Sequence, residues 1–300
     1  MSQVTVSPES LEVGGRTRTM TVVHRTRTTP GPVPLVLVFH GSMQNASALR
    51  AMTANSLDEI GAQAGAVVAY LDGHKKHWND ARISNSSAAR KEQVDDVAFA
   101  KAAIDLVVSR YDGDRAQVYA VGFSNGGQMV IRLIHEIPSA LAGAAVLSAT
   151  QTRADDFAPR DPQDEPVPVM FVHGTKDPIV PYAGGMARML RISPRGIGVS
   201  APESAAFYAR RNAITASPVT HPLGADGAKP TWTERTDYRQ PGHRPVTLYT
   251  VHGAGHTIPV RKKGTSNILA RAILGRTDHT LDTSQVISEF FDLAARDRHA

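Results

Sequence analysis

The sequence predicts an α/β fold in which a mainly parallel central sheet has helices on both faces and an antiparallel hairpin near the N-terminus. Segments of β type and helical type alternate along the 300 residues, as they do where helices connect parallel strands. The segment PLVLVFHG (34–41) is continuously apolar, which is typical of a strand buried on both faces. The segment GRTRTMTVVHRTRT (15–28) alternates Arg with Thr and predicts a half-exposed hairpin.

Five helices are predicted from apolar spacing and from residues that cap or end helices. Apolar residues recur at helical spacing from Leu49 to Ile60, which predicts the first helix. Asp95 or Asp96 is expected to cap the second, and the third should end before Pro138 because the residue preceding proline disfavours helical backbone. The expected helices are 46–65, 94–111, 127–137, 202–213 and 283–295.

Apolar and β-branched runs between these helices predict the strands, which are 19–25, 34–41, 66–73, 117–123, 142–149, 167–174 and 245–253. Two segments, 183–201 and 214–245, are rich in Gly, Pro and polar residues and are interpreted as loop excursions over the sheet. We therefore expect residues 1–300 to form a single domain without a separate cap domain.

Composition narrows the function further. The apolar fraction is 41% and the charged fraction 20%, as in globular proteins with a buried core. The net charge of +5 comes from scattered Lys and Arg, so we expect no nucleic-acid partner. There is no cysteine, no apolar signal segment at the N-terminus and no run long enough to span a membrane. We expect a cytoplasmic protein without a membrane partner, and the oligomeric state is left open.

The most informative motif lies between a predicted strand and a predicted helix. Residues 122–126 read Gly-Phe-Ser-Asn-Gly, a G-x-S-x-G arrangement in which the serine occupies a sharp turn and the flanking residues must be small. The following helix directs its N-terminal N–H groups toward Ser124. The pattern predicts a nucleophilic serine, whereas the alternative is a serine that only caps the helix.

A serine nucleophile needs a histidine base and a carboxylate that orients it. Asp177 follows the strand over 167–174, and His256 lies in the loop after the last strand. Both are expected at the carboxyl edge of the sheet, in the chain order serine, acid, histidine. Asp155 and Asp156 are alternatives for the acid, and His252 is an alternative for the base. No metal site is expected, since the spacing of His252 and His256 is interrupted by glycines.

Acyl transfer also requires backbone N–H donors for the oxyanion. One donor is expected at Asn125, directly after the serine. The other should come from the loop that follows the strand over 34–41, where Ser42 is the first choice and Met43 the alternative.

Seven separated motifs together resemble the polyhydroxybutyrate depolymerase and feruloyl esterase-like branch of the α/β-hydrolases. The resemblance covers roughly residues 17–293, and it implies an ester hydrolase with Ser124, Asp177 and His256 as catalytic residues. The motifs are HGSMQNA, HWNDAR, VDDVAFAKAAID, RAQVYAVGFSNGGQMVIRL, HGTKDPIVPY, GAGHTIP and ILGRTDHTLDTSQVISEFF. The resemblance further implies that Trp78 and Asn79 border the substrate pocket. Ile258 is expected to border it as well, because it stands where relatives tend to carry a tryptophan beside the histidine.

The expected function is therefore a serine carboxylesterase without a cofactor, acting on a small-molecule or oligomeric ester through an acyl-enzyme. One alternative is an acyltransferase or cyclase that uses the same three side chains. Another is a non-catalytic ligand-binding protein, because a fold alone does not establish activity.

Overall fold

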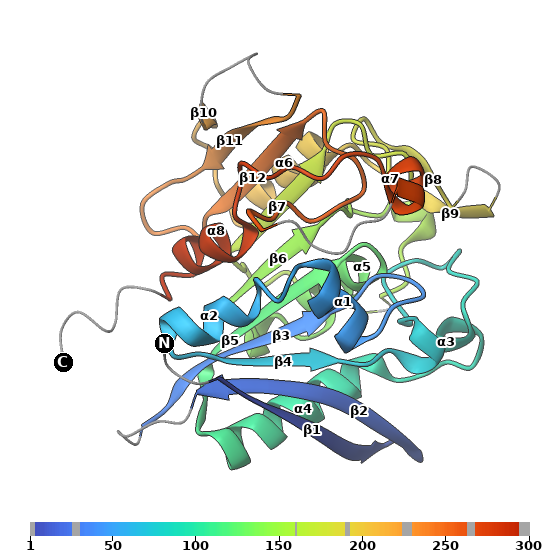
Figure 1. Cartoon of the computed structure of the whole chain (residues 1–300). Helices are drawn as coiled ribbons and strands as arrows, with labels where there is room; N and C mark the ends of the chain where they lie inside the picture. Colours follow the sequence, from blue (N-terminus) through green and yellow to red (C-terminus); the bar gives the residue numbers. More distant parts are fainter. Residues whose placement is uncertain are drawn as a thin grey trace.

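The computed structural model describes residues 4–25, 31–159, 161–189, 193–223, 230–262 and 268–293. Within these ranges a ten-stranded sheet has the strand order β1-β2-β4-β3-β5-β6-β7-β12-β11-β10 (Figure 1). Its strands are β1 (Val4–Val13), β2 (Arg16–Arg25), β3 (Val33–Phe39), β4 (Val67–Leu71), β5 (Gly113–Phe123), β6 (Gly143–Leu147), β7 (Val169–Gly174), β10 (Val219–Leu223), β11 (Trp232–Tyr238) and β12 (Val246–His252).

The centre of the sheet is parallel and its two edges are antiparallel. Strands β4, β3, β5, β6, β7 and β12 pair in parallel. At one edge β1 and β2 form the N-terminal antiparallel hairpin, and at the other β10 and β11 continue the sheet in antiparallel fashion. The predicted α/β architecture and hairpin are confirmed. All residues of β3, β4, β6 and β7 are buried, as continuously apolar central strands should be.

Helices lie on both faces of the sheet (Figure 1), and side chains pack in two apolar layers, one on each face. Alternate residues of β3 enter different layers: Leu35, Leu37 and Phe39 face one, and Val36 and Val38 face the other, because side chains alternate along a strand. The first layer includes α4 (Asp96–Tyr111), α5 (Asn125–Glu136) and α6 (Ala201–Arg211). The second includes α1 (Ala46–Met52), α2 (Asp58–Ala64) and α8 (Thr283–Phe290). The remaining helical elements are short. They are α3 (Ala88–Lys91), α7 (Ile268–Leu274) and 3-10 turns at His74–Lys76, Pro138–Ala140 and Ala154–Asp156.

The helix predicted over 46–65 is divided into α1 and α2. Ala54 and Asn55 between them both have positive φ, a backbone conformation that no α-helix contains. The helix over 94–111 begins as expected, with the Asp95 side chain accepting the N–H of Ala98. Among the helices that the structure describes, none has the length and apolarity to cross a membrane.

The interpretation of 183–201 and 214–245 as loops is wrong for a large part of both segments. The first contains the hairpin of β8 (Gly185–Met189) and β9 (Ser193–Gly198), and the second contains β10 and β11. These strands carry Gly, Pro or charged residues in place of a regular apolar alternation, and they exist because each pairs with a neighbouring strand. That residues 1–300 form one domain without a separate cap stays a prediction.

The register of the parallel strands brings four connecting loops to one edge of the sheet. Phe39 at the end of β3 lies opposite Gly122 of β5, and Gly174 at the end of β7 lies opposite Val251 of β12. The loops that follow these strands carry Ser42, Ser124, Asp177 and His256. A parallel sheet collects such loops at its carboxyl edge.

Candidate active site

Ser124 occupies a strained turn between β5 and α5. Its backbone has φ 55° and ψ −115°, a conformation that costs a non-glycine residue about 1–3 kcal/mol. Its N–H donates to the carbonyl of Leu147 at 2.8 Å, and its carbonyl accepts the N–H of Gln128 at 3.0 Å. These bonds on both sides hold the hydroxyl at the start of α5.

The two glycines of the motif are required by close backbone contacts. A Cβ at Gly122 would lie 2.1 Å from the carbonyl oxygen of Gly126. A Cβ at Gly126 would lie 2.1 Å from the carbonyl oxygen of Phe39 and 2.6 Å from that of His40. The start of α5 therefore packs directly on the backbone at the end of β3, where the Ser42 loop begins.

His256 connects the serine to a carboxylate. Its Nε2 lies 2.8 Å from Ser124 Oγ, and its Nδ1 lies 2.7 Å from Asp177 Oδ2. The other oxygen of Asp177 accepts the N–H groups of Ile179 and Val180, each at 2.8 Å. The Asp177 and His256 side chains are buried, so both bonds lie in a medium that screens charge weakly.

The carboxylate is held in its ionised form. Burial acts to raise the pKa of Asp177, but the facing His256 and His173 imidazoles and the N–H of Val180 outweigh it and place the pKa below its ordinary value. His173 Nε2 lies 3.5 Å from Asp177 Oδ2 and 2.9 Å from the carbonyl oxygen of Val180. Sequence reasoning missed His173, although it precedes Gly174 in the motif that contains the acid.

The structure gives the alternative residues partners outside the contact of Ser124, His256 and Asp177. The exposed Asp155 pairs with Arg153, and Asp156 accepts the N–H and hydroxyl of Ser84. His252 pairs with Glu234 and stacks on Trp232. Of the candidate acids and bases, the structure therefore brings together Asp177 and His256.

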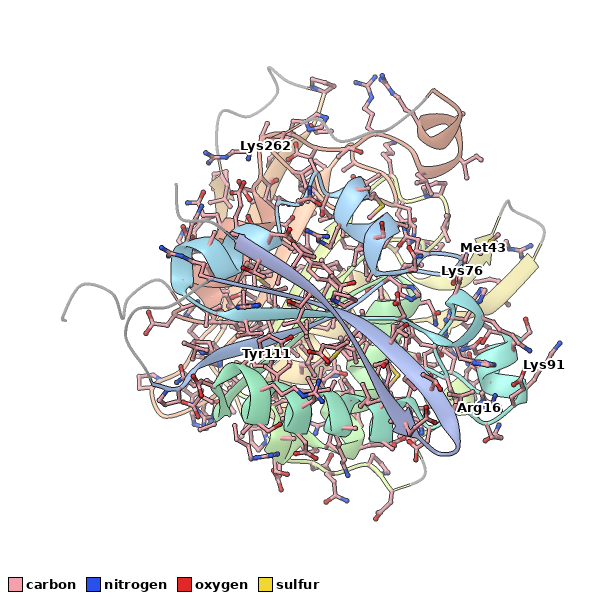
Figure 2. The ribbon with its side chains drawn as sticks, turned by 60° about the horizontal axis from the view of Figure 1, so that its bottom comes forward. Arg16, Met43, Lys76, Lys91, Tyr111 and Lys262 are labelled. Carbon is pink, nitrogen blue, oxygen red and sulfur yellow. The ribbon has the colours of Figure 1, made fainter. Side chains whose placement is uncertain are left out.

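The two candidate donors of the loop after β3, Ser42 and Met43, differ in whether the N–H group is already used. Met43 donates its N–H to the carbonyl of Lys76 at 3.0 Å, and both residues lie on the same rim of the molecule (Figure 2). In the part of the chain that the structure describes, the N–H groups of Ser42 and Asn125 have no protein partner. Ser42, Asn125 and Ser124 line one cavity, so this geometry favours Ser42 over Met43 as the donor.

The expectation that Trp78, Asn79 and Ile258 border this cavity is not met: all three are buried and none is among its lining residues. Trp78 donates its indole N–H to the carbonyl of His40 and its backbone N–H to Asn125 Oδ1. Asn79 donates to Val94, and Ile258 belongs to the apolar layer that contains α8. Trp78 instead holds the side chain of Asn125, the residue that follows the serine.

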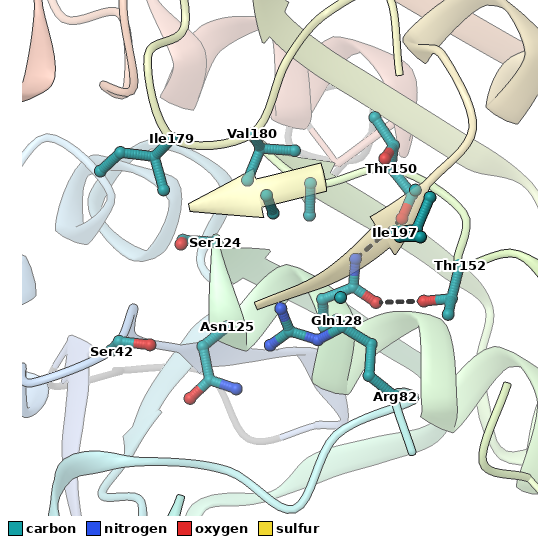
Figure 3. Close-up of a pocket in the computed structure, with 14 residues that line it drawn as sticks. Ser42, Arg82, Ser124, Asn125, Gln128, Thr150, Thr152, Ile179, Val180 and Ile197 are labelled. Carbon is teal, nitrogen blue, oxygen red and sulfur yellow. Dashed lines mark hydrogen bonds between the residues drawn. The ribbon is translucent and has the colours of Figure 1, made fainter. Parts of the chain in front are cut away.

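The cavity beside Ser124 is small, with about 30 Å³ of space for the centres of water-sized molecules. Figure 3 shows its polar side chains on one side and Ile179 and Val180 on another. Sequence reasoning identified only the residues next to the serine and missed the walls, because these come from segments far apart in the chain. The lining residues are Ser42, Arg82, Ser124, Asn125, Gln128, Ala149, Thr150, Thr152, Ile179, Val180, Ala187, Gly196, Ile197 and Gly198. In the described ranges, no group of three or more His, Cys, Asp or Glu could hold a metal ion.

The chain is similar to known esterases in sequence and in fold. The model of the phospholipase/carboxylesterase family matches residues 33–191, more than half of the chain. The chain is 29% identical to "Putative esterase NocK" of Nocardia uniformis subsp. tsuyamanensis over 97% of its length and 83% of that protein. It is 25% identical to Feruloyl esterase B of Piromyces equi over 74% of its length and 39% of that protein.

Among solved structures, the acetyl xylan esterase of Aspergillus awamori aligns with 96% of this chain and 100% of its own, with a TM-score of 0.61 and 12% identity. This likeness shows the fold. The expected resemblance to α/β-hydrolase esterases is confirmed, while the narrower likeness to polyhydroxybutyrate depolymerases stays a prediction. The matched family model and the whole-length similarity to an esterase show that this chain is an esterase of the α/β-hydrolase fold, a member of the phospholipase/carboxylesterase family.

Proposed function

We propose that the chain hydrolyses small carboxylic esters through an acyl-enzyme formed on Ser124. The observation that carries this proposal is the continuous contact from Ser124 Oγ through His256 to Asp177, with distances of 2.8 and 2.7 Å. A serine hydroxyl is a weak nucleophile until a neighbouring base takes its proton. His256 Nε2 lies within reach of that proton, and Asp177 holds the proton-bearing Nδ1.

In the first half of the reaction, Ser124 Oγ attacks the ester carbonyl while His256 takes the hydroxyl proton. The negative charge on the former carbonyl oxygen is stabilised by the N–H groups of Ser42 and Asn125. His256 then returns the proton to the leaving alcohol, and the acyl group stays on Ser124. Asp177 remains a carboxylate and stabilises the positive charge that His256 carries in this step.

In the second half, a water molecule gives a proton to His256 and attacks the acyl carbonyl. Collapse of this intermediate breaks the bond to Ser124 Oγ, and His256 returns the proton to that oxygen. The acid product leaves and the free enzyme is restored.

The test is covalent labelling with a fluorophosphonate together with hydrolysis of p-nitrophenyl acetate. We expect the wild-type chain to gain the mass of one probe less HF, because the serine oxygen displaces fluoride, and Ser124→Ala to lose both labelling and at least about 10⁴-fold in kcat. Ser109→Ala is the matched control, because Ser109 is an exposed serine on α4 whose hydroxyl donates to the carbonyl of Leu106. Labelling of Ser124→Ala at the wild-type rate would refute the proposal. Product analysis with an added alcohol checks the acyl-transfer alternative, which predicts a new ester in place of free acid.

A further inference from the structure

The two N–H groups that would bind the oxyanion belong to loops far apart in the chain. Ser42 follows β3, and Asn125 is the first residue of α5. Both line the cavity beside Ser124 (Figure 3). Donors of this kind act when they are held about 2.7–3.1 Å from the place where the oxyanion forms. A group that fixes the two loops relative to each other therefore contributes to catalysis without touching the substrate.

The backbone of Trp78 holds the side chain of Asn125. The Trp78 N–H donates to Asn125 Oδ1 at 3.0 Å, and the Trp78 carbonyl oxygen accepts from Asn125 Nδ2 at 3.5 Å. The same Nδ2 donates to the buried carboxylate of Asp80 at 2.5 Å. Both ends of the Asn125 amide are thus bound, so this side chain ties the start of α5 to the segment that contains Trp78.

The indole of Trp78 holds the other loop. Its Nε1–H donates to the carbonyl of His40 at 2.9 Å, two residues before Ser42. The ring also packs edge-on against Phe39 and lies tilted against the His40 imidazole, with centroid distances of 5.1 and 4.9 Å. Trp78 is fully buried, so water does not compete for this hydrogen bond. One residue therefore bonds to both loops that carry a proposed oxyanion donor.

The direct contact between the two loops limits only how closely they approach. A Cβ at Gly126 would lie 2.6 Å from the carbonyl oxygen of His40, so the two backbones already touch there. Van der Waals contacts of this kind are individually weak, and they offer little resistance when the loops separate. The hydrogen bonds of Trp78 supply that resistance, because one is made to each loop.

Trp78 is anchored by bonds that involve neither loop. Asn85 Nδ2 donates to the Trp78 carbonyl oxygen at 2.8 Å. The next residue, Asn79, donates its N–H to Asp96 Oδ2 at 2.7 Å and its side-chain amide to the carbonyl of Val94 at 2.9 Å. These bonds attach the Trp78 segment to the start of α4. The indole and the backbone of Trp78 thus have a fixed support from which to hold the two loops.

We propose that Trp78 is a positioning residue that fixes the distance between the oxyanion donors, the N–H groups of Ser42 and Asn125. It is not one of the described residues that line the cavity, and it acts through the two loops. This inference rests on the proposed function, because it requires an oxyanion in the reaction. The oxyanion develops in the transition states and is absent from the bound ester, so Trp78 contributes to kcat and leaves KM unchanged.

The test is Trp78→Phe, which removes the indole N–H and keeps a buried aromatic ring. We expect kcat for p-nitrophenyl acetate to fall about ten-fold or more, short of the 10²–10³-fold cost of removing a donor altogether. Acylation and deacylation each pass through an oxyanion and should slow together, so KM should stay within about two-fold. The inhibition constant of 1,1,1-trifluoroacetone, which adds to a catalytic serine as an oxyanion, should rise by about the same factor as kcat falls.

The matched control is Tyr70→Phe. Tyr70 is also fully buried, and its hydroxyl donates to Asp58 Oδ1 at 2.6 Å, away from both loops. This variant loses a buried hydrogen bond and should lose stability, while its kcat, KM and inhibition constant stay at the wild-type values. An unchanged kcat in a destabilised Trp78→Phe would give Trp78 a structural role only and overturn the proposal. A fall in kcat without weaker binding of trifluoroacetone would also overturn it, as would a rise in KM alone.

A second variant keeps the proposal testable if Trp78→Phe does not fold. Asn125→Ala removes the other attachment of Trp78 and keeps the backbone N–H of this residue. It should show the same pattern, with lower kcat, unchanged KM and weaker binding of trifluoroacetone. Wild-type kcat in Asn125→Ala would refute the coupling of the two loops through Trp78. Failure of the proposed function is seen separately, as retained activity in Ser124→Ala.

Discussion

Replacing Asp177 by asparagine changes one atom of the site and reverses the direction of one hydrogen bond. In the structure, Asp177 Oδ1 accepts two backbone N–H groups, from Ile179 and Val180, while Oδ2 faces His256 Nδ1. An asparagine keeps its carbonyl oxygen toward the two N–H donors and turns its NH2 group toward His256. The imidazole must then accept at Nδ1 and carry its proton on Nε2, which faces Ser124 Oγ. In this tautomer His256 cannot take the serine proton.

The size of the effect follows from the cost of restoring the active tautomer. The asparagine would have to rotate by half a turn, which leaves two buried N–H groups facing an NH2 group. Each unsatisfied buried donor costs about 1–3 kcal/mol, so the rotation costs about 2–6 kcal/mol. The charge that stabilises protonated His256 in the transition state is lost as well. We expect kcat to fall by about 10⁴-fold, close to what loss of the carboxylate charge costs in serine proteases.

The assay is hydrolysis of p-nitrophenyl acetate, with Asp155→Asn and Asp156→Asn as matched controls. Asp155 is exposed and pairs with Arg153, and Asp156 bonds to Ser84, so neither touches His256. Each control should change kcat by less than about ten-fold, as surface substitutions do. The reasoning is refuted if Asp177→Asn keeps a tenth of the wild-type kcat, or if either control is the variant that loses activity.

Three further predictions concern folding, pH and metals. Gly126→Ala should lower the free energy of unfolding by more than about 3 kcal/mol, measured by urea denaturation, because its Cβ would lie 2.1 Å from the Phe39 carbonyl; a stable, active variant would contradict the described packing. Burial lowers the pKa of His40 to about 4, and burial together with Arg211 lowers that of His135 to about 3. As pH falls below about 6.5 the unfolded chain binds protons that the folded chain does not, so stability should drop by about 2 kcal/mol per histidine between pH 7.5 and 5. His135→Gln should reduce the drop by about 2 kcal/mol, and a drop of the same size in that variant would show the assignment to be wrong. Incubation with EDTA should leave kcat unchanged, and its loss together with recovery on adding a divalent cation would reveal a metal requirement.

The contact of Ser124, His256 and Asp177 in the candidate site could be predicted from the sequence because these residues belong to local patterns. Gly122, Ser124 and Gly126 occupy one turn, and Asp177 and His256 each follow an apolar strand that reads as parallel and buried. Parallel strands bring their carboxyl ends to one edge, so the order of strands was enough to expect that these side chains meet. The choice of Ser42 over Met43 needed the structure, because it depends on which N–H the carbonyl of Lys76 takes.

The walls of the site could not be predicted, because they depend on contacts between distant segments. The hairpin of β8 and β9 carries Gly and Pro, β10 contains a proline, and β11 carries charged residues, so neither pair has the apolar alternation of a strand. Pairing with a neighbouring strand decides their conformation, as tertiary context commonly does for strands. Trp78 was placed at the pocket by resemblance, yet its indole turns inward to the carbonyl of His40. Arg82 had no local signal except its position in the motif HWNDAR.

The contact of the Gly126 backbone with the carbonyl groups of Phe39 and His40 has a consequence for how this enzyme can evolve. At this contact backbone lies directly on backbone, so a side-chain substitution there cannot adjust in small steps the spacing between Ser124 and Ser42, the proposed nucleophile and oxyanion donor. The walls of the cavity, by contrast, are side chains such as Arg82, Ile179 and Ile197, which can be exchanged without moving that backbone. Natural selection for a new substrate, and any mutant library built for one, therefore has its useful variation in the walls, while the reacting geometry is inherited unchanged.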